Sequence, residues 1–181
     1  MLKTELRADL RQRRAAIRDD ERSGLNRRLI RHISASSLWQ EARHVGLYLA
    51  FNREADITAL LEQSDDKNLY LPAISGKLMQ FQPVTSQMQM ETLSYGLQQP
   101  VFIPGASQPD IDLYLMPLLG FDGNGNRLGM GGGYYDRYFA EHHAGIRAGI
   151  AYACQQVQQL PTDPWDVTLQ HIFTEQGHHE F

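Results

Sequence analysis

A glycine-rich stretch, DGNGNRLGMGGGYYDR, runs from Asp122 to Arg137 and carries the residues best suited to binding chemistry. Glycine loses more backbone entropy on folding than any other residue, so many glycines in one loop indicate a backbone that must approach something closely. Linkers lack aromatic residues, whereas this stretch follows an apolar run and leads into Tyr134 and Tyr135. We therefore expect an ordered strand–loop–helix unit whose N–H groups form an anion site suited to phosphates, with a purely structural glycine turn as the alternative.

The common nucleotide and calcium loops do not fit this stretch. A GxxxxGK[ST] loop is absent, since the only Gly-Lys pair is Gly76-Lys77 and Leu78 follows it. The GxGxxG fingerprint lacks its last glycine in either register. A calcium loop would need glycine where Arg127 stands and glutamate where Gly133 stands. What remains is a nucleotide loop of another kind.

A row of cations lies near the start of the chain, in a segment with helical periodicity from residue 2 to about residue 18. Its members recur on one helical face beside an apolar stripe of Leu2, Leu6, Leu10 and Ile17, and they are Lys3, Arg7, Arg11, Arg14 and Arg18. Such a row could reach an anionic ligand held by the glycine loop, which has no lysine of its own. A solvated basic face is the alternative.

Three carboxylates are candidates for a site. Glu54 follows the apolar run VGLYLA, at the end of an expected buried strand, where open α/β sheets bind ligands; a solvated loop acid is the alternative. Asp136 follows the glycine loop, and a carboxylate beside phosphates needs a cation between them, which makes it a candidate Mg²⁺ ligand. Asp166 could supply a second carboxylate. The pairs His142-His143 and His178-His179 do not suggest a metal site, because adjacent helical residues face apart and the second pair lies in a polar tail.

The elements that must position these residues alternate between helical and strand patterns. We expect helices over 2–18, 20–33 and 134–142 and a short one from residue 56 or 58, with strands over 45–50, 68–74, 78–83, 111–116, 147–152 and 172–174. Residues 87–99 are predicted to form an irregular arm in which Tyr95 is a packing residue, with a platform for a ligand as the alternative. This alternation predicts one α/β domain over residues 1–181, with a mainly parallel sheet and helices on both faces.

Composition narrows the class of protein. The chain has 42% hydrophobic and 21% charged residues, a formal charge of -4 and a pI near 5.9, which give no argument for nucleic acid or membrane binding. No apolar run reaches the roughly 18 residues of a membrane span, and MLKTELRADLRQRR is not a signal peptide, so we expect a cytoplasmic protein. The single cysteine, Cys154, excludes an internal disulfide and reads as a small core residue.

Taken together, these motifs resemble those of the 5-formyltetrahydrofolate cyclo-ligase (5,10-methenyltetrahydrofolate synthetase) family. The resemblance rests on Lys3 and Arg7 in the first helix, YLAFNREADIT, MPLLGFDGNGNRLGMGGGYYDR and WDVTLQHIFT. It implies a Mg²⁺-requiring enzyme in which ATP phosphorylates the formyl oxygen of 5-formyltetrahydrofolate, N10 attacks the imidoyl phosphate carbon, and phosphate leaves to give 5,10-methenyltetrahydrofolate. We expect a monomer. A non-catalytic folate- or nucleotide-binding regulator, or an RNA-binding module using the N-terminal cations, remains open.

The resemblance also assigns residues. Catalysis falls to Glu54, which would orient the formyl group and N10, and to Arg127. The ATP contacts it implies are Lys3, Thr4, Glu5, Leu6, Arg7, Arg127, Leu128, Gly129, Met130, Gly131, Gly132, Gly133, Tyr134 and Tyr135, with Arg14 a further candidate. The folate contacts are Leu49, Glu54, Tyr95, Met130, Gly131, Gly132, Gly133 and Tyr134, and the Mg²⁺ ligands are Asp136 and Asp166. Met130 stands where relatives usually carry arginine, so Arg127 or Arg137 would have to replace that cation.

Overall fold

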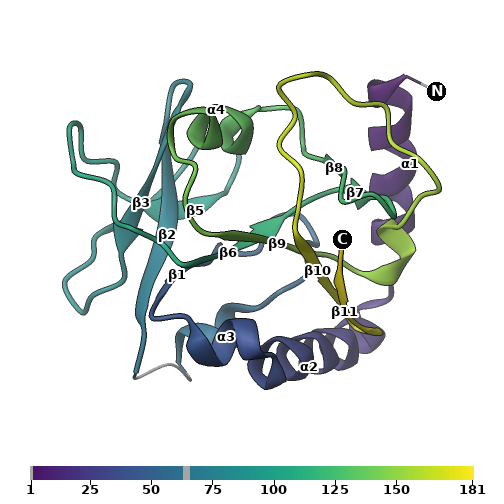
Figure 1. Ribbon diagram of the computed structural model, residues 1–181, viewed down its shortest axis with the longest axis horizontal. Coiled ribbons are helices and arrows are strands. Elements are labelled where there is room, and N and C mark those ends of the chain that lie inside the picture. Colours follow the sequence, from purple (N-terminus) through teal and green to yellow (C-terminus); the bar gives the residue numbers. More distant parts are fainter. Residues whose placement is uncertain (1, 63–65) are drawn as a thin grey trace.

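The computed structural model describes residues 2–62 and 66–181 and is built around a seven-stranded sheet with the order β11-β10-β9-β6-β1-β2-β3 (Figure 1). The five inner strands are parallel, and β11 and β3 run antiparallel at the two edges. The strands are β1 His44–Gly46, β2 Asn68–Ser75, β3 Leu78–Pro83, β6 Leu113–Pro117, β9 Ile146–Ile150, β10 His171–Thr174 and β11 Gly177–Glu180. The α/β fold class and the mainly parallel sheet are confirmed.

Helices cover both faces of the sheet, as expected. Helices α2 (Asp19–Ala35) and α3 (Ser37–Glu41) lie on one face, α4 (Tyr134–Glu141) lies on the other, and α1 (Lys3–Ala15) stands at the side of the molecule (Figure 1). Strand β6 shows why both faces must be covered. Leu113 and Leu115 point into the core under α2 and α3, whereas Tyr114 and Met116 join the core under α4. Alternate residues of a strand face opposite sides, so a strand this apolar needs two cores.

The strand expected over 45–50 ends at Gly46, and the cause lies in the neighbouring strand. The Leu47 N–H still donates to the Tyr70 carbonyl at 2.8 Å. The next bond of a parallel ladder would come from residue 72 to the Leu47 carbonyl, and Pro72 has no N–H to donate. The chain therefore leaves the sheet after Leu47, and residues 48–54 bend over the carboxyl end of β1.

Several short elements differ from the sequence-based expectation. Residues 87–99 are not an irregular arm, because β4 (Met90–Thr92) pairs with β5 (Gln98–Pro100) as an antiparallel ribbon. Helix α3 and strand β11 were not expected, and the segment near residue 58 is the 3₁₀ turn η1 (Thr58–Leu61). The glycine-rich stretch begins as a small hairpin of β7 (Gly120–Phe121) and β8 (Arg127–Leu128).

The prediction of a buried Cys154 is wrong. It lies in the 3₁₀ turn η2 (Ala153–Gln155) with an exposed side chain. The neighbouring Gln155 is the buried residue, and its amide donates to the carbonyls of Leu118 and Leu119 at 2.9 and 3.0 Å. A single 3₁₀ turn places neighbouring side chains in different directions, so the apolar sequence around Cys154 does not determine its burial.

Candidate active site

A cavity of about 560 Å³ lies at the carboxyl ends of β1 and β6, between α1, the glycine loop and the segment 48–54. Open parallel sheets bind ligands at this edge, and the volume falls within the roughly 300–1,000 Å³ of small-molecule sites. The cavity brings together most of the predicted site residues: Lys3, Arg7, Leu49, Glu54, Tyr95, the whole of Arg127–Asp136, and Asp166.

The glycine loop owes its shape to buried hydrogen bonds and to left-handed backbone. The Asp122 side chain is fully buried and accepts hydrogen bonds from the N–H groups of Asn124, Asn126 and Leu160 at 2.9 to 3.2 Å. Gly131 and Gly133 have φ values of 106° and 64°, which only glycine adopts readily. Gly133 caps α4 without a side-chain acceptor, so the first-turn N–H groups of α4 are left for a ligand.

Helix α1 carries its cations to this loop by packing an apolar face. Leu6 and Leu10 pack with Leu128 and Leu160 in a small core of their own. On the same side, the Arg7 Nε donates to the Gly129 carbonyl at 2.9 Å. Lys3, Arg7 and Arg11 line the cavity as a result.

Four residues of the predicted ATP set do not line the cavity. Thr4 and Glu5 are exposed, and the Glu5 carboxylate accepts from the Leu2 N–H at 2.9 Å and so caps the helix. Leu6 belongs to the apolar face. Arg14 is 2% exposed and donates to the Asn52 carbonyl at 2.8 Å. For Thr4, Glu5 and Leu6 the cause is the helical period, since only every third or fourth residue of α1 can face the cavity. Arg14 does share the stripe of Arg7 and Arg11, but the turn at Asn52 covers it.

Arg127 and Asp136 form an ion pair inside the site. The Arg127 Nη2 lies 2.5 Å from the Asp136 Oδ1, which also accepts from the Val167 N–H at 3.1 Å. Burial lowers the pKa of the Arg127 guanidinium, and the Asp136 carboxylate opposes that effect. The Arg127 Nε is buried without a hydrogen-bond partner among the residues that the structure describes. Arg127 lines the cavity, so its guanidinium carries one donor that the ion pair does not use.

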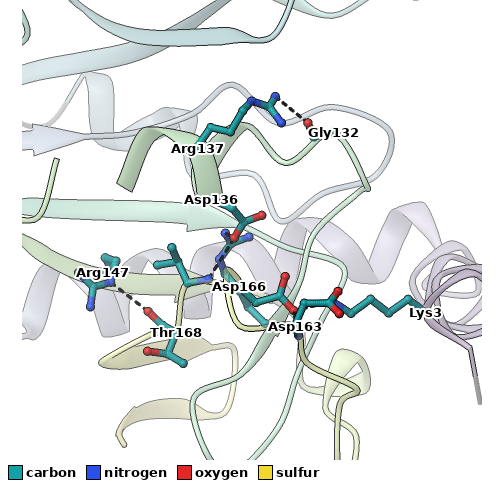
Figure 2. Close-up of polar contacts among 10 residues, drawn as sticks. Lys3, Gly132, Asp136, Arg137, Arg147, Asp163, Asp166 and Thr168 are labelled. Carbon is teal, nitrogen blue, oxygen red and sulfur yellow. Dashed lines mark hydrogen bonds and ion pairs between the residues drawn. The ribbon is translucent and has the colours of Figure 1, made fainter. Parts of the chain in front are cut away.

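Lys3 connects the two ends of the chain close to this ion pair. Its ammonium lies 2.6 Å from the Asp163 carboxylate and 2.5 Å from the Asp166 carboxylate. Figure 2 shows the Lys3 side chain extending toward these two residues. Asp166 also accepts from the Asp163 N–H at 2.8 Å. Burial lowers the pKa of Lys3, but hydrogen bonds to these two carboxylates outweigh it, so the pKa is raised overall.

The carboxylates fit a magnesium ion that is shared with a substrate phosphate. Asp163 and Asp166 already hold one cationic group between them, and Asp136 lies beside Asp166 in Figure 2. Within residues 2–62 and 66–181, no three His, Cys, Asp or Glu side chains are grouped as metal ligands. Mg²⁺ commonly takes one or two protein carboxylates and completes its shell with water and phosphate oxygens, so this set suits a nucleotide-bound ion better than a resident one.

Glu54 is presented by a strained turn. Asn52 and Arg53 both adopt left-handed backbone, with φ values of 48° and 66°. Such conformations cost a non-glycine residue about 1–3 kcal/mol each and persist where the surroundings enforce them. The Glu54 carboxylate accepts from the Phe51 N–H at 2.9 Å, and its own N–H donates to the Phe51 carbonyl at 3.1 Å. Burial raises the pKa of Glu54, whereas the Phe51 hydrogen bond and the charge of Arg14 lower it.

Apolar and aromatic side chains complete the wall beside Glu54. Tyr95 is 55% exposed, lines the cavity, and meets the Phe51 ring edge-on at a centroid distance of 5.8 Å. This exposure is more than its predicted packing role would leave, and it suits a platform for a flat ligand. Met130 lines the cavity at 38% exposure.

Arg137 does not replace the cation missing at Met130. Its guanidinium donates to the carbonyls of Lys77 and Gly132 at 2.9 and 2.8 Å, so it joins the β2–β3 turn to the glycine loop (Figure 2 shows the second bond). Arg7, Arg11 and Arg127 remain as the cavity arginines.

The structure adds residues that the sequence did not single out. Arg11, Asp163 and Trp165 line the cavity, and only Arg11 gave a signal, since it belongs to the row of cations. That row is divided in the structure. Lys3, Arg7 and Arg11 face the cavity, Arg14 is buried, and Arg18 pairs with Asp20 and Glu21 at 3.3 and 2.8 Å. The five cations therefore do not form one continuous face.

Comparison with known proteins decides the family. The family model of 5-formyltetrahydrofolate cyclo-ligases matches residues 1–175. The chain belongs to this family. It is 31% identical to the 5-formyltetrahydrofolate cyclo-ligase of Haemophilus influenzae over 91% of this chain and 93% of that protein. The enzyme of Escherichia coli is 30% identical, with 91% and 96% covered.

Solved structures agree with this membership. The 5,10-methenyltetrahydrofolate synthetase of Aquifex aeolicus superposes with a TM-score of 0.85 at 29% identity, covering 99% of this chain and 93% of that one. The synthetase of Mycoplasma pneumoniae gives 0.74 at 26% identity, covering 97% and 99%. The resemblance read from the glycine loop, the first helix and Glu54 is confirmed, and the chain is an ATP-dependent ligase of folate one-carbon metabolism.

Proposed function

We propose that this chain converts 5-formyltetrahydrofolate to 5,10-methenyltetrahydrofolate at the cavity described above, with ATP consumed to ADP and phosphate. The observation that carries the proposal is that one cavity joins a phosphate-type glycine loop, four cations and the half-buried acid Glu54. The reaction is that of the family to which the chain belongs. The geometry of the cavity supports separate roles for the residues that would bind phosphate, folate and metal.

We place the ATP phosphates against the loop Gly129–Gly133 and the start of α4. Glycines let the backbone approach a ligand, and the free N–H groups of a helix start favour anions. Arg7, Arg127 and Lys3 line the same side of the cavity and would neutralise the phosphate charge. Transfer of a phosphoryl group depends on alignment and on stabilisation of spreading negative charge, which such donors provide.

We place the folate between Leu49, Glu54, Tyr95 and Met130. Tyr95 offers an exposed ring on which a flat heterocycle can stack. The Glu54 carboxylate would hold N10 and the formyl group in line for ring closure and could accept the proton that N10 loses. Its position on a braced turn supports this role, because a positioning acid must not move when the substrate binds.

We assign Mg²⁺ to Asp136 and Asp166, with Asp163 beside them. Bound there, the ion would neutralise charge on the ATP phosphates. The residues contribute oxygen ligands, and Lys3 and Arg127 are the cations that now satisfy those oxygens.

We further propose that the protein acts as a cytoplasmic monomer without nucleic-acid or membrane partners, in one domain over residues 1–181. No helix among the described residues combines the length and apolar character needed to cross a bilayer. The divided row of cations on α1 supports the absence of an RNA surface, and family membership favours an enzyme over a non-catalytic regulator.

Product formation tests the function directly. The protein is mixed with 5-formyltetrahydrofolate, ATP and Mg²⁺, and the absorbance of the methenyl product is followed. We expect product only when ATP is present. No product, or equal product without ATP, would refute the proposal, and a regulator would bind the ligands without turnover.

A further inference from the structure

The turn that carries Glu54 is braced by the junction between α1 and α2. Its two left-handed residues each make a contact with that junction. The Arg14 Nη2 donates to the Asn52 carbonyl at 2.8 Å. The Arg53 guanidinium donates to the Ile17 carbonyl and lies 3.1 Å from the Asp19 carboxylate. These contacts supply what a strained turn needs in order to persist.

Arg14 brings a buried charge to the same place. The residue is 2% exposed, and its Nη1 is buried without a hydrogen-bond partner in the described part of the chain. A charge this buried is costly unless an opposite charge lies close. Burial lowers the pKa of Arg14, and the carboxylate of Glu54 opposes that effect more than any other group does.

Glu54 depends on Arg14 in turn. The ionisable groups that face Glu54 come from three segments: Arg14 on α1, Tyr48 on the chain after β1, and Tyr135 on α4. Burial raises the pKa of both tyrosines, so they are neutral at physiological pH. Burial also raises the pKa of Glu54, and Arg14 is the charge that lowers it. Among the described residues, Arg14 is therefore the cation that favours the ionised form of Glu54.

We propose that Arg14 is a positioning residue for Glu54: it fixes the left-handed turn through Asn52 and supplies the counter-charge of the carboxylate from beneath the cavity floor. This inference rests on the proposed role of Glu54, and it replaces the expectation that Arg14 contacts ATP. Arg14 does not line the cavity, so its effect must pass through the turn and the carboxylate.

The test compares Arg14→Met, Arg14→Lys and a control, Arg13→Met, across pH. Arg13 lies next along α1 but is 44% exposed and pairs with Asp9 on the surface. Arg14→Met removes the counter-charge and so raises the pKa of Glu54. As the pH falls, the ionised carboxylate is therefore lost at a higher pH than in the wild type. We expect kcat at pH 7 to fall about 10-fold or more, the acid limb of kcat to move up by about one pH unit, and the KM for ATP to change less than about twofold. Arg14→Lys should restore the limb, and Arg13→Met should match the wild type.

Two outcomes would overturn the inference. A raised KM for ATP with an unmoved acid limb would make Arg14 a nucleotide contact. If folded Arg14→Met has the wild-type kcat and the wild-type acid limb, Arg14 does not position Glu54.

A double-mutant cycle with Glu54→Gln separates this inference from the proposed function and needs no turnover. Melting temperatures of the two single variants and the double variant measure whether the side chains act on each other. We expect the Arg14→Met shift in melting temperature to differ between the wild-type and Glu54→Gln backgrounds, and equal shifts would refute the pairing. If the wild type forms no product but the shifts differ, the pairing holds and the proposed function fails.

Discussion

Replacing Lys3 by methionine should strengthen the binding of Mg²⁺ to the nucleotide-free protein. Lys3 holds its ammonium 2.6 and 2.5 Å from the carboxylates of Asp163 and Asp166. Both oxygens contact the same nitrogen, so they lie within about 5 Å of each other. Without the ammonium, two negative charges would face each other across that gap, and a divalent cation would be the natural replacement.

The two distances set the size of the effect. The substitution removes the repulsion between the ammonium and an ion on the same oxygens. At about 5 Å, this repulsion is about 1 kcal/mol per unit charge in water and about 3 kcal/mol at an effective dielectric constant near 20. The side chains of Asp163 and Asp166 are 43% and 19% exposed, which favours the lower part of this range. A gain of about 1–2 kcal/mol corresponds to Mg²⁺ affinity increased roughly 5- to 30-fold.

Titration of MgCl₂ into the protein without nucleotide measures this affinity, by calorimetry or by tryptophan fluorescence. Trp165 is 69% exposed beside Asp166 and lines the cavity, whereas Trp39 belongs to α3 and is 6% exposed, so fluorescence changes report on the site. Lys77→Met is the matched control, because Lys77 lies outside the cavity in the β2–β3 turn. Unchanged or weaker Mg²⁺ binding in Lys3→Met, or an equal change in the control, would refute the reasoning. The same substitution should raise the KM for ATP.

Three further predictions follow from contacts already described. Glu54→Gln should lower kcat about 100-fold or more while the KM for ATP stays within about twofold, and near-normal turnover in the methenyl absorbance assay would remove Glu54 from the site. Arg7→Met loses the charge-assisted bond to the Gly129 carbonyl, so the KM for ATP should rise about 10-fold, and an unchanged KM would leave Arg7 a structural clamp only. Asp122→Ala should lower the free energy of unfolding by about 1–3 kcal/mol at pH 7, because buried N–H groups lose their acceptor. Burial opposes ionisation of Asp122, but hydrogen bonds from Asn126, Leu160 and Asn124 lower its pKa overall. The loss of stability measured by urea unfolding should therefore become smaller as the pH falls below about 4. A difference in stability that stays constant with pH would contradict this account.

The fold could be predicted where periodicity is strong. The apolar runs of the inner strands, β6 among them, predict a mainly parallel sheet that is covered on both faces. The structure has such a sheet, with a core on each face. The early end of β1 also had a sequence signal, but it lies in another strand, at Pro72. Pro72 predicts the end of β1 only if β1 is known to pair with β2, and the periodicity of a single segment does not predict which strands pair.

The candidate site was predictable where one loop carries its chemistry. Residues 127–136 of the glycine-rich stretch line one cavity with Glu54 and Lys3, as their residue types suggested. The partnership of Lys3 with Asp163 was not predictable, because 160 residues separate them and neither belongs to a local motif. Arg14 shares a helical stripe with Arg7, yet α1 ends beneath the Glu54 turn, and this tertiary position buries Arg14.

The bond from Lys3 to Asp163 and Asp166 has a consequence for synthesis of the protein. The first helix leaves the ribosome early, whereas its carboxylate partners are added about 160 residues later. At about 5–20 residues per second, roughly 8–30 s pass before the two can meet. During that interval Leu6 and Leu10 also wait for Leu128 and Leu160. The nascent chain therefore exposes an amphipathic cationic helix until residues 128–166 have been made, and such a transiently exposed surface is of the kind that chaperones bind.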